Sequence, residues 1–149
     1  MSDAKSKRIL ILANRTAVTP KVVEVVRQRA EAGDSSFALL ITAEDPSGEE
    51  AEQMLELSVP ILEEAAGEPI ARLIGNPNPV LAVREALERE GGFDEVIIAT
   101  LPERVSRWLR RDLPRRIEQL GVPVTVVVAK QAQRPVWAEE TYERAPWLP

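Results

Sequence analysis

The sequence contains no cysteine and no histidine among its 149 residues. Without cysteine, disulfides and thiolate chemistry are excluded, and without histidine the usual general base and the usual zinc ligand are missing. Any catalysis would rest on Asp, Glu, Lys, Arg, Ser, Thr or the single tyrosine, so we do not expect an enzyme. A chain without cysteine also fits the cytoplasm, where we expect this protein to be located.

Long apolar runs are absent as well. None approaches the roughly 18 residues needed to span a membrane, and residues 9–13 are too short for the core of a signal peptide. We therefore expect a soluble protein with no membrane association. The composition, with 44% hydrophobic and 29% charged residues, is ordinary for one globular domain that buries its own core.

Charge is present but unevenly distributed. The net charge is −5, yet residues 104–116 hold six arginines and one aspartate, so the rest of the chain carries −10. The overall acidity argues against nucleic-acid binding, whereas the local basic segment suits a small anionic ligand or a partner. The same arginines would also fit a solvated helix face that pairs with nearby glutamates.

Apolar runs alternate with helical patterns along most of the chain. Continuous apolar runs, typical of strands buried on both faces, predict strands at residues 8–13, 37–42, 70–74, 95–100 and 124–129. Thr19-Pro20 and Asn78-Pro79 each combine a helix N-cap with proline at the first helical position. Helices between parallel strands predict one doubly wound α/β domain over residues 1–129, with helices on both faces of a five-stranded sheet. Residues 130–149 are predicted to form an irregular C-terminal tail.

Three local signals carry more specific predictions. Ser47 and Glu50 have capping-box spacing and predict the start of a helix that runs to about residue 66. Pro60 lies inside this helix and should kink or interrupt it. After the fourth strand, residues 106–111 suit a short helical piece, and Asp112 can cap a second helix that ends at Gly121.

Neither the dinucleotide fingerprint nor the P-loop pattern is present, but the predicted carboxyl edge of the sheet still offers ligand contacts. A phosphoacceptor receiver domain is excluded, because it needs acidic residues where this chain has Asn14 and Gly75. The candidate ligand-binding residues share positions at or just after the strand ends, or lie in the arginine-rich segment: Asn14, Thr16, Thr42, Gly75, Thr100, Arg104, Arg107 and Arg111.

Residues 14–16, 75–77 and 122–128, with the strand and helix order that links them, give the chain a resemblance to the universal stress protein family. The resemblance covers about residues 7–129. It implies a doubly wound five-stranded parallel sheet and a homodimer formed through the last strand, residues 124–129. Nucleotide-binding members carry two glycines after strand four, spaced by two residues, and nine residues later a Gly-Ser or Gly-Thr pair.

At that spacing this chain has Ala99, Pro102, Asp112 and Leu113, so all four positions depart from the family pattern. Proline removes an amide donor, Ala99 adds a Cβ where phosphate would approach, and Asp112 places a carboxylate at the helix start. We therefore expect a non-enzymatic binding or scaffold protein of this kind that has lost ATP binding and needs no cofactor. The alternative is a binder of ATP, AMP or another phosphate-containing ligand that uses the carboxyl edge and the arginines.

Overall fold

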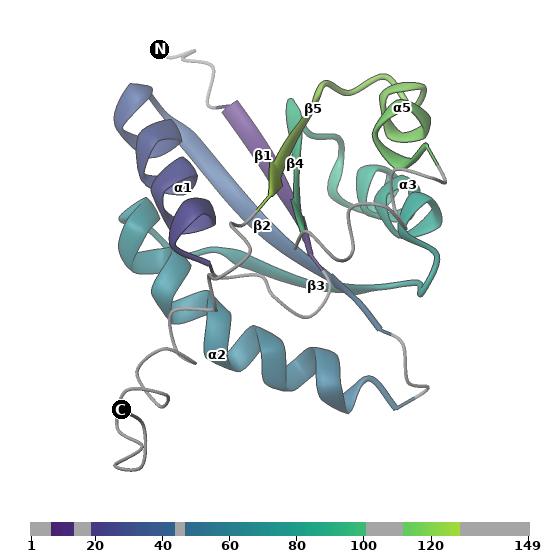
Figure 1. Cartoon of the computed structure of the whole chain (residues 1–149), viewed down its shortest axis with the longest axis horizontal. Coiled ribbons are helices and arrows are strands. Elements are labelled where there is room, and N and C mark those ends of the chain that lie inside the picture. Colours follow the sequence, from purple (N-terminus) through teal and green to yellow (C-terminus); the bar gives the residue numbers. More distant parts are fainter. Residues whose placement is uncertain (1–6, 14–18, 44–46, 101–111, 129–149) are drawn as a thin grey trace, which may run out of the picture.

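The computed structural model describes residues 7–13, 19–43, 47–100 and 112–128. In these residues strands and helices alternate along the chain (Figure 1). The elements are β1 (Lys7–Ala13), α1 (Pro20–Ala32), β2 (Ser35–Thr42), α2 (Glu49–Ala66), β3 (Ala71–Gly75), α3 (Pro79–Glu90), β4 (Glu95–Thr100), α5 (Leu113–Glu118) and β5 (Val124–Val128). Neither the predicted helical piece at 106–111 nor the predicted tail at 130–149 falls within the described residues.

All five strands pair in parallel, in the order β3-β2-β1-β4-β5. Helices α1 and α2 pack together on one face of the sheet, and α3 and α5 pack together on the other (Figure 1). The chain winds outward from β1 through β2 to β3, then returns to place β4 on the other side of β1. This arrangement confirms the predicted doubly wound α/β domain, with the change of winding direction between β1 and β4.

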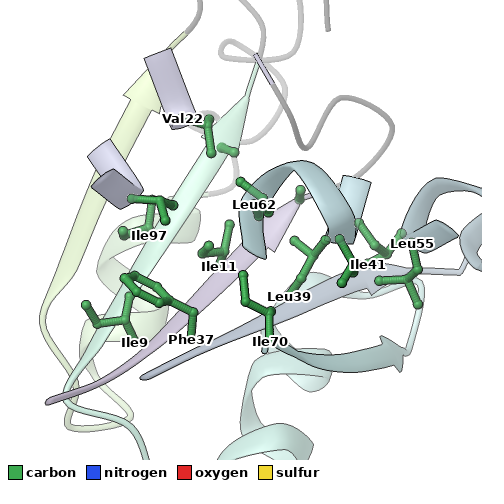
Figure 2. Close-up of a cluster of buried hydrophobic side chains, with 14 of the residues drawn as sticks. Ile9, Ile11, Val22, Phe37, Leu39, Ile41, Leu55, Leu62, Ile70 and Ile97 are labelled. Carbon is green, nitrogen blue, oxygen red and sulfur yellow. The ribbon is translucent and has the colours of Figure 1, made fainter. Parts of the chain in front are cut away.

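Each face of the sheet has its own apolar core. Ile9 and Ile11 of β1 point toward α1 and α2, where Figure 2 shows them among residues such as Leu39 and Leu62. Leu10 and Leu12, which alternate with them along the strand, belong to the core under α3 and α5. All four β1 side chains are fully buried. A continuous apolar strand is therefore required, because helices cover both of its faces.

The predicted starts of α1 and α3 are confirmed. The amide of Val22 donates to Oγ1 of Thr19 at 3.4 Å, and the amides of Val80 and Leu81 donate to Oδ1 of Asn78 at 3.0 and 3.3 Å. A proline follows each cap at the first helical position, where it sacrifices no hydrogen bond. Within the described parts of the chain, no helix is both long and apolar enough to cross a bilayer.

The predicted capping box of α2 is wrong. The helix begins at Glu49, and its N-cap is Gly48, which has a left-handed backbone (φ 74°) that favours glycine. Ser47 lies one residue earlier, and its Oγ accepts from the Glu49 amide at 3.2 Å. Pro60 does not interrupt the helix, which continues to Ala66. Pro60 and Glu56, whose carbonyl loses its partner, are both exposed residues of α2, so water can replace the missing amide.

Candidate functional site

The carboxyl edge of the sheet brings together three of the predicted ligand-binding residues. Thr42 ends β2 and is the register partner of Gly75, the last residue of β3. Thr100 ends β4, and since β1 lies between β2 and β4, the two threonines stand about 10 Å apart by strand spacing. Thr42 and Thr100 are 4% and 6% exposed. Both threonines thus lie at the edge where α/β sheets bind ligands, but both are buried residues.

Gly75 has a packing role that the sequence did not reveal. A Cβ at this position would lie 2.8 Å from Cβ of Ala82 and 2.9 Å from Cδ1 of Leu40, closer than side chains approach. The absence of a side chain therefore allows α3 to lie directly on β2 and β3. The carbonyl of Gly75 also accepts from the Ala43 amide at 3.0 Å. A ligand contact by Gly75 stays a prediction.

The remaining predicted ligand-binding residues lie outside the described residues: Asn14, Thr16, Arg104, Arg107 and Arg111. Pro102, one of the four departures from the nucleotide-binding pattern, lies outside them too. Ala99 lies within β4, 2% exposed, and belongs to the core beneath α1 and α2. The structure therefore describes the strand ends of this edge, and not the loops that follow β1 and β4.

The prediction that Asp112 caps its helix is wrong. Asp112 occupies the N-cap position of α5, but its side chain makes no capping hydrogen bond. Its backbone is left-handed (φ 58°, ψ 39°), and in this conformation Oδ2 accepts from Nη1 of Arg115 at 3.5 Å. Asp112 is the one non-glycine residue with positive φ in the described part of the chain. Asp112 thus adopts a conformation that is typical of glycine.

The first turn of α5 is built for packing. Leu113 is 2% exposed and lies in the core beneath α3, with Ile117 one turn later. Pro114 has no amide to donate. The helix ends at Glu118 and continues as a turn to Gly121, so it is shorter than predicted. Among the described residues, no group of three or more Asp or Glu side chains is placed to hold a metal ion.

The opposite, amino edge of the sheet carries a polar network that sequence reasoning missed. Glu95, the first residue of β4, is 6% exposed. Nε and Nη2 of Arg29 donate to its two oxygens at 3.1 and 2.8 Å, and Oγ1 of Thr125 donates to Oε2 at 2.7 Å. Nζ of Lys7 lies 3.9 Å from Oε1. The one available signal was an acidic residue at the start of an otherwise apolar strand.

The protonation of this network follows from its contacts. Burial raises the pKa of Glu95, but the hydrogen bonds from Arg29 and Thr125 and the charges of Arg29 and Lys7 outweigh it, so the pKa lies below its ordinary value. The hydrogen bond to Glu95 raises the pKa of Arg29 against the effect of burial. Both groups are therefore charged at neutral pH, and they form a fixed ion pair between α1 and β4.

A cleft of about 480 Å³ opens beside this ion pair. It is lined by the end of α1, the starts of β1 and β2, and the residue before β4: Lys7, Arg29, Ala32, Gly33, Asp34, Ser35 and Asp94. A second, shallower depression of about 390 Å³ lies between α2 and β3. A cleft lined by charged residues thus lies at the amino edge, away from the predicted ligand site.

The parallel strand order and the helices on both faces define this protein as a doubly wound α/β domain. No protein-family model matches the chain, and no curated protein matches its sequence. The resemblance to the universal stress family accordingly rests on the residues given above, and any function drawn from it is a proposal.

Proposed function

We propose that this chain is a non-enzymatic binding or scaffold protein, similar to universal stress proteins, in which the phosphate site has been lost. The observation that carries the proposal is the start of α5. A phosphate cradle needs free amides and close backbone approach. Here Asp112 contributes a carboxylate, Leu113 is buried in the core, and Pro114 lacks an amide.

Binding is favoured over catalysis by the side chains available. The sequence has no histidine or cysteine to serve as base or nucleophile. The one buried carboxylate in the described residues belongs to Glu95, and Arg29, Thr125 and Lys7 already surround it. An ionised carboxylate held by three partners has little capacity to take up a proton near neutral pH.

The proposal includes three features that the resemblance implies: a homodimer through β5, a cytoplasmic location and a role in the response to stress. The position of β5 at one edge of the sheet supports the first of these, because an edge strand has unpaired backbone groups available. The side chain of Val126 on this strand is 38% exposed.

Ligand analysis tests the loss of the phosphate site. Denatured, purified protein is expected to release no nucleotide, and ATP, AMP and pyrophosphate at millimolar concentration should leave the melting temperature unchanged. A ligand present at 100 times its Kd would stabilise the fold by about 2.7 kcal/mol, which is a shift of several degrees. Asp112→Gly keeps the left-handed backbone and removes the carboxylate. These ligands should still leave its melting temperature unchanged, since Leu113 and Pro114 remain.

A released nucleotide, or a clear shift with any of these ligands, would contradict the proposal and favour a nucleotide or phosphate binder. The double variant Arg107→Ala/Arg111→Ala then identifies the contacts. If the variant no longer shows a ligand-dependent shift in melting temperature, the anion binds to the arginine-rich segment. If the shift is unchanged, the polar contacts are the threonines at the strand ends, Thr42 and Thr100.

A further inference from the structure

We infer that the cleft at the amino edge of the sheet binds a small zwitterion, a molecule that carries an ammonium group and a carboxylate a short distance apart. The cleft volume of about 480 Å³ lies in the range of small-molecule sites and exceeds that of an amino acid. It is formed by the end of α1, the first residue of β1, the start of β2 and the residue just before β4.

The charges in the cleft alternate across the edge of the sheet. Because β1 lies between β2 and β4, Lys7 at its start stands between Asp34, just before β2, and Asp94, just before β4. Hydrogen bonds fix this order. The amide of Lys7 donates to the carbonyl of Asp34 at 2.9 Å, and the amide of Asp94 donates to the carbonyl of Arg8 at 2.7 Å. The amide of Arg8 donates in turn to Oδ2 of the Asp94 side chain at 2.7 Å. A cation is therefore held between two acids.

These three charges are not neutralised by one another. Within the described part of the chain, neither Asp34 nor Asp94 has an ion-pair partner within 4.0 Å, and Lys7 has one contact, at 3.9 Å, with a Glu95 carboxylate that Arg29 already occupies. The Lys7 side chain is 54% exposed. A simple anion would be repelled by the two aspartates, and a simple cation by the lysine, because the charge of Arg29 is already paired with Glu95. A zwitterion can satisfy both signs at once.

Arg29 supplies a second, rigid contact for the carboxylate end. Its Nε and Nη2 are bound to Glu95, which leaves Nη1 without a partner among the described residues and the side chain 29% exposed at the wall of the cleft. A guanidinium fixed by a buried carboxylate loses little entropy when it binds a ligand. We place the ligand carboxylate on Lys7 and Arg29, and its ammonium group on Asp34, because the Asp94 carboxylate already accepts from the Arg8 amide.

Three small molecules of matched length test this assignment by their effect on backbone amide signals in NMR spectra. γ-Aminobutyrate carries both charges, butyrate only the negative one, and butylamine only the positive one. γ-Aminobutyrate should shift the amides of Gly33, Ser35 and Asp94 with a Kd in the millimolar range, as expected for a ligand of few atoms. Butyrate and butylamine should bind at least about tenfold more weakly, since each lacks one charge-assisted contact.

Gly33 offers a variant that fills the cleft without straining the fold. Its backbone is extended (φ 163°), and a Cβ built on it meets no atom within 4 Å, so Gly33→Leu should fold normally and abolish the shifts. Asp34→Asn and Lys7→Gln should each weaken binding by about tenfold. Lys21→Gln, on an exposed position of α1 outside the cleft, is the matched control and should bind as the wild type does.

Butylamine binding as tightly as γ-aminobutyrate, no shifts with γ-aminobutyrate at all, or shifts that survive in Gly33→Leu would each overturn the inference. If Gly33→Leu fails to fold, the Asp34→Asn and Lys7→Gln variants decide it. The cleft lies at the amino edge of the sheet, opposite to the carboxyl edge where the phosphate site is proposed to have been lost. A nucleotide that bound at the carboxyl edge would leave the signals of Gly33 and Asp34 in place, so the two proposals can fail separately.

Discussion

A single missing methyl group determines how closely α3 approaches the sheet. Gly75 lies where Cβ of Ala82 and Cδ1 of Leu40 leave no room for a side chain, and its backbone is not in the left-handed region. Its importance is therefore steric rather than conformational. Gly33 is the opposite case, since it faces open space with an extended backbone.

Gly75→Ala should destabilise the fold by about 1–3 kcal/mol, because the added methyl must displace α3 or the Leu40 side chain from a packed core. Gly33→Ala should change the free energy of unfolding by less than about 0.5 kcal/mol, or raise it slightly by restricting the unfolded chain. Urea denaturation of both variants and the wild type measures the difference. Equal stabilities for the two variants would show that α3 does not pack against Gly75 as described.

At the scale of elements, Glu95 connects three segments that are distant in sequence. Arg29 comes from α1 and Thr125 from β5, and each donates to the carboxylate that begins β4. Helix α1 and the edge strand β5 are thus both connected to β4 by one side chain. Hydrogen bonds to a charged group contribute more than neutral ones, and this contribution depends on Glu95 remaining ionised.

Glu95→Gln keeps the shape of the side chain and removes its charge. It should therefore lower the free energy of unfolding by about 1–3 kcal/mol at neutral pH. The pKa of Glu95 is lowered on folding, and a lowered pKa stabilises the folded state above the unfolded value of 4.5. This contribution is lost as the pH falls from 4.5 through the lower folded pKa. The stability difference between wild type and Glu95→Gln should therefore shrink in acid.

Unfolding midpoints at pH 7 and across the acid range check this dependence. Glu64→Gln, at an exposed position of α2, is the control and should track the wild type at every pH. A difference between wild type and Glu95→Gln that stayed constant into strong acid would mean that the Glu95 carboxylate is not the group that titrates.

Much of the element order was predictable, because a strand that is covered by helices on both faces has a continuous apolar run in its sequence. β2 begins at Ser35, two residues before its apolar run, since the parallel ladder pairs Ser35 with Lys7 at the start of β1. Pairing with a neighbour, which no single segment encodes, sets that boundary. Asp112 was misjudged for a related reason, because its left-handed backbone depends on how the chain enters α5.

The candidate sites show the same limit. Thr42, Gly75 and Thr100 were correctly placed at the carboxyl edge, because parallel strands end together there. The amino-edge network was not predicted. Arg29 lies 66 residues and Thr125 lies 30 residues from Glu95 in the sequence, and only the strand order β2-β1-β4-β5 brings them together.

At the scale of the whole molecule, β3 and β5 are the two edge strands of the sheet that the described residues form, and they differ in character. β3 has five residues and carries Arg72, a charge that discourages edge-to-edge pairing. β5 also has five residues, but they are valine and threonine alone. The two exposed large apolar side chains of the described residues are Val126 on β5 and Leu57 on α2, 38% and 44% exposed. Of the two edges, β5 is the better suited to pair with a second copy of the chain.

If β5 forms the dimer, Val126→Lys should convert it to a monomer, because a desolvated lysine and its copy across a symmetric interface would repel each other. Leu57→Lys introduces the same charge at a position on α2 and should remain dimeric. Sedimentation velocity over a range of concentrations distinguishes the monomer mass of 16.5 kDa from twice that value. A wild-type chain that sediments as a monomer at every concentration would rule out the dimer, and dissociation by Leu57→Lys alone would move the interface to α2.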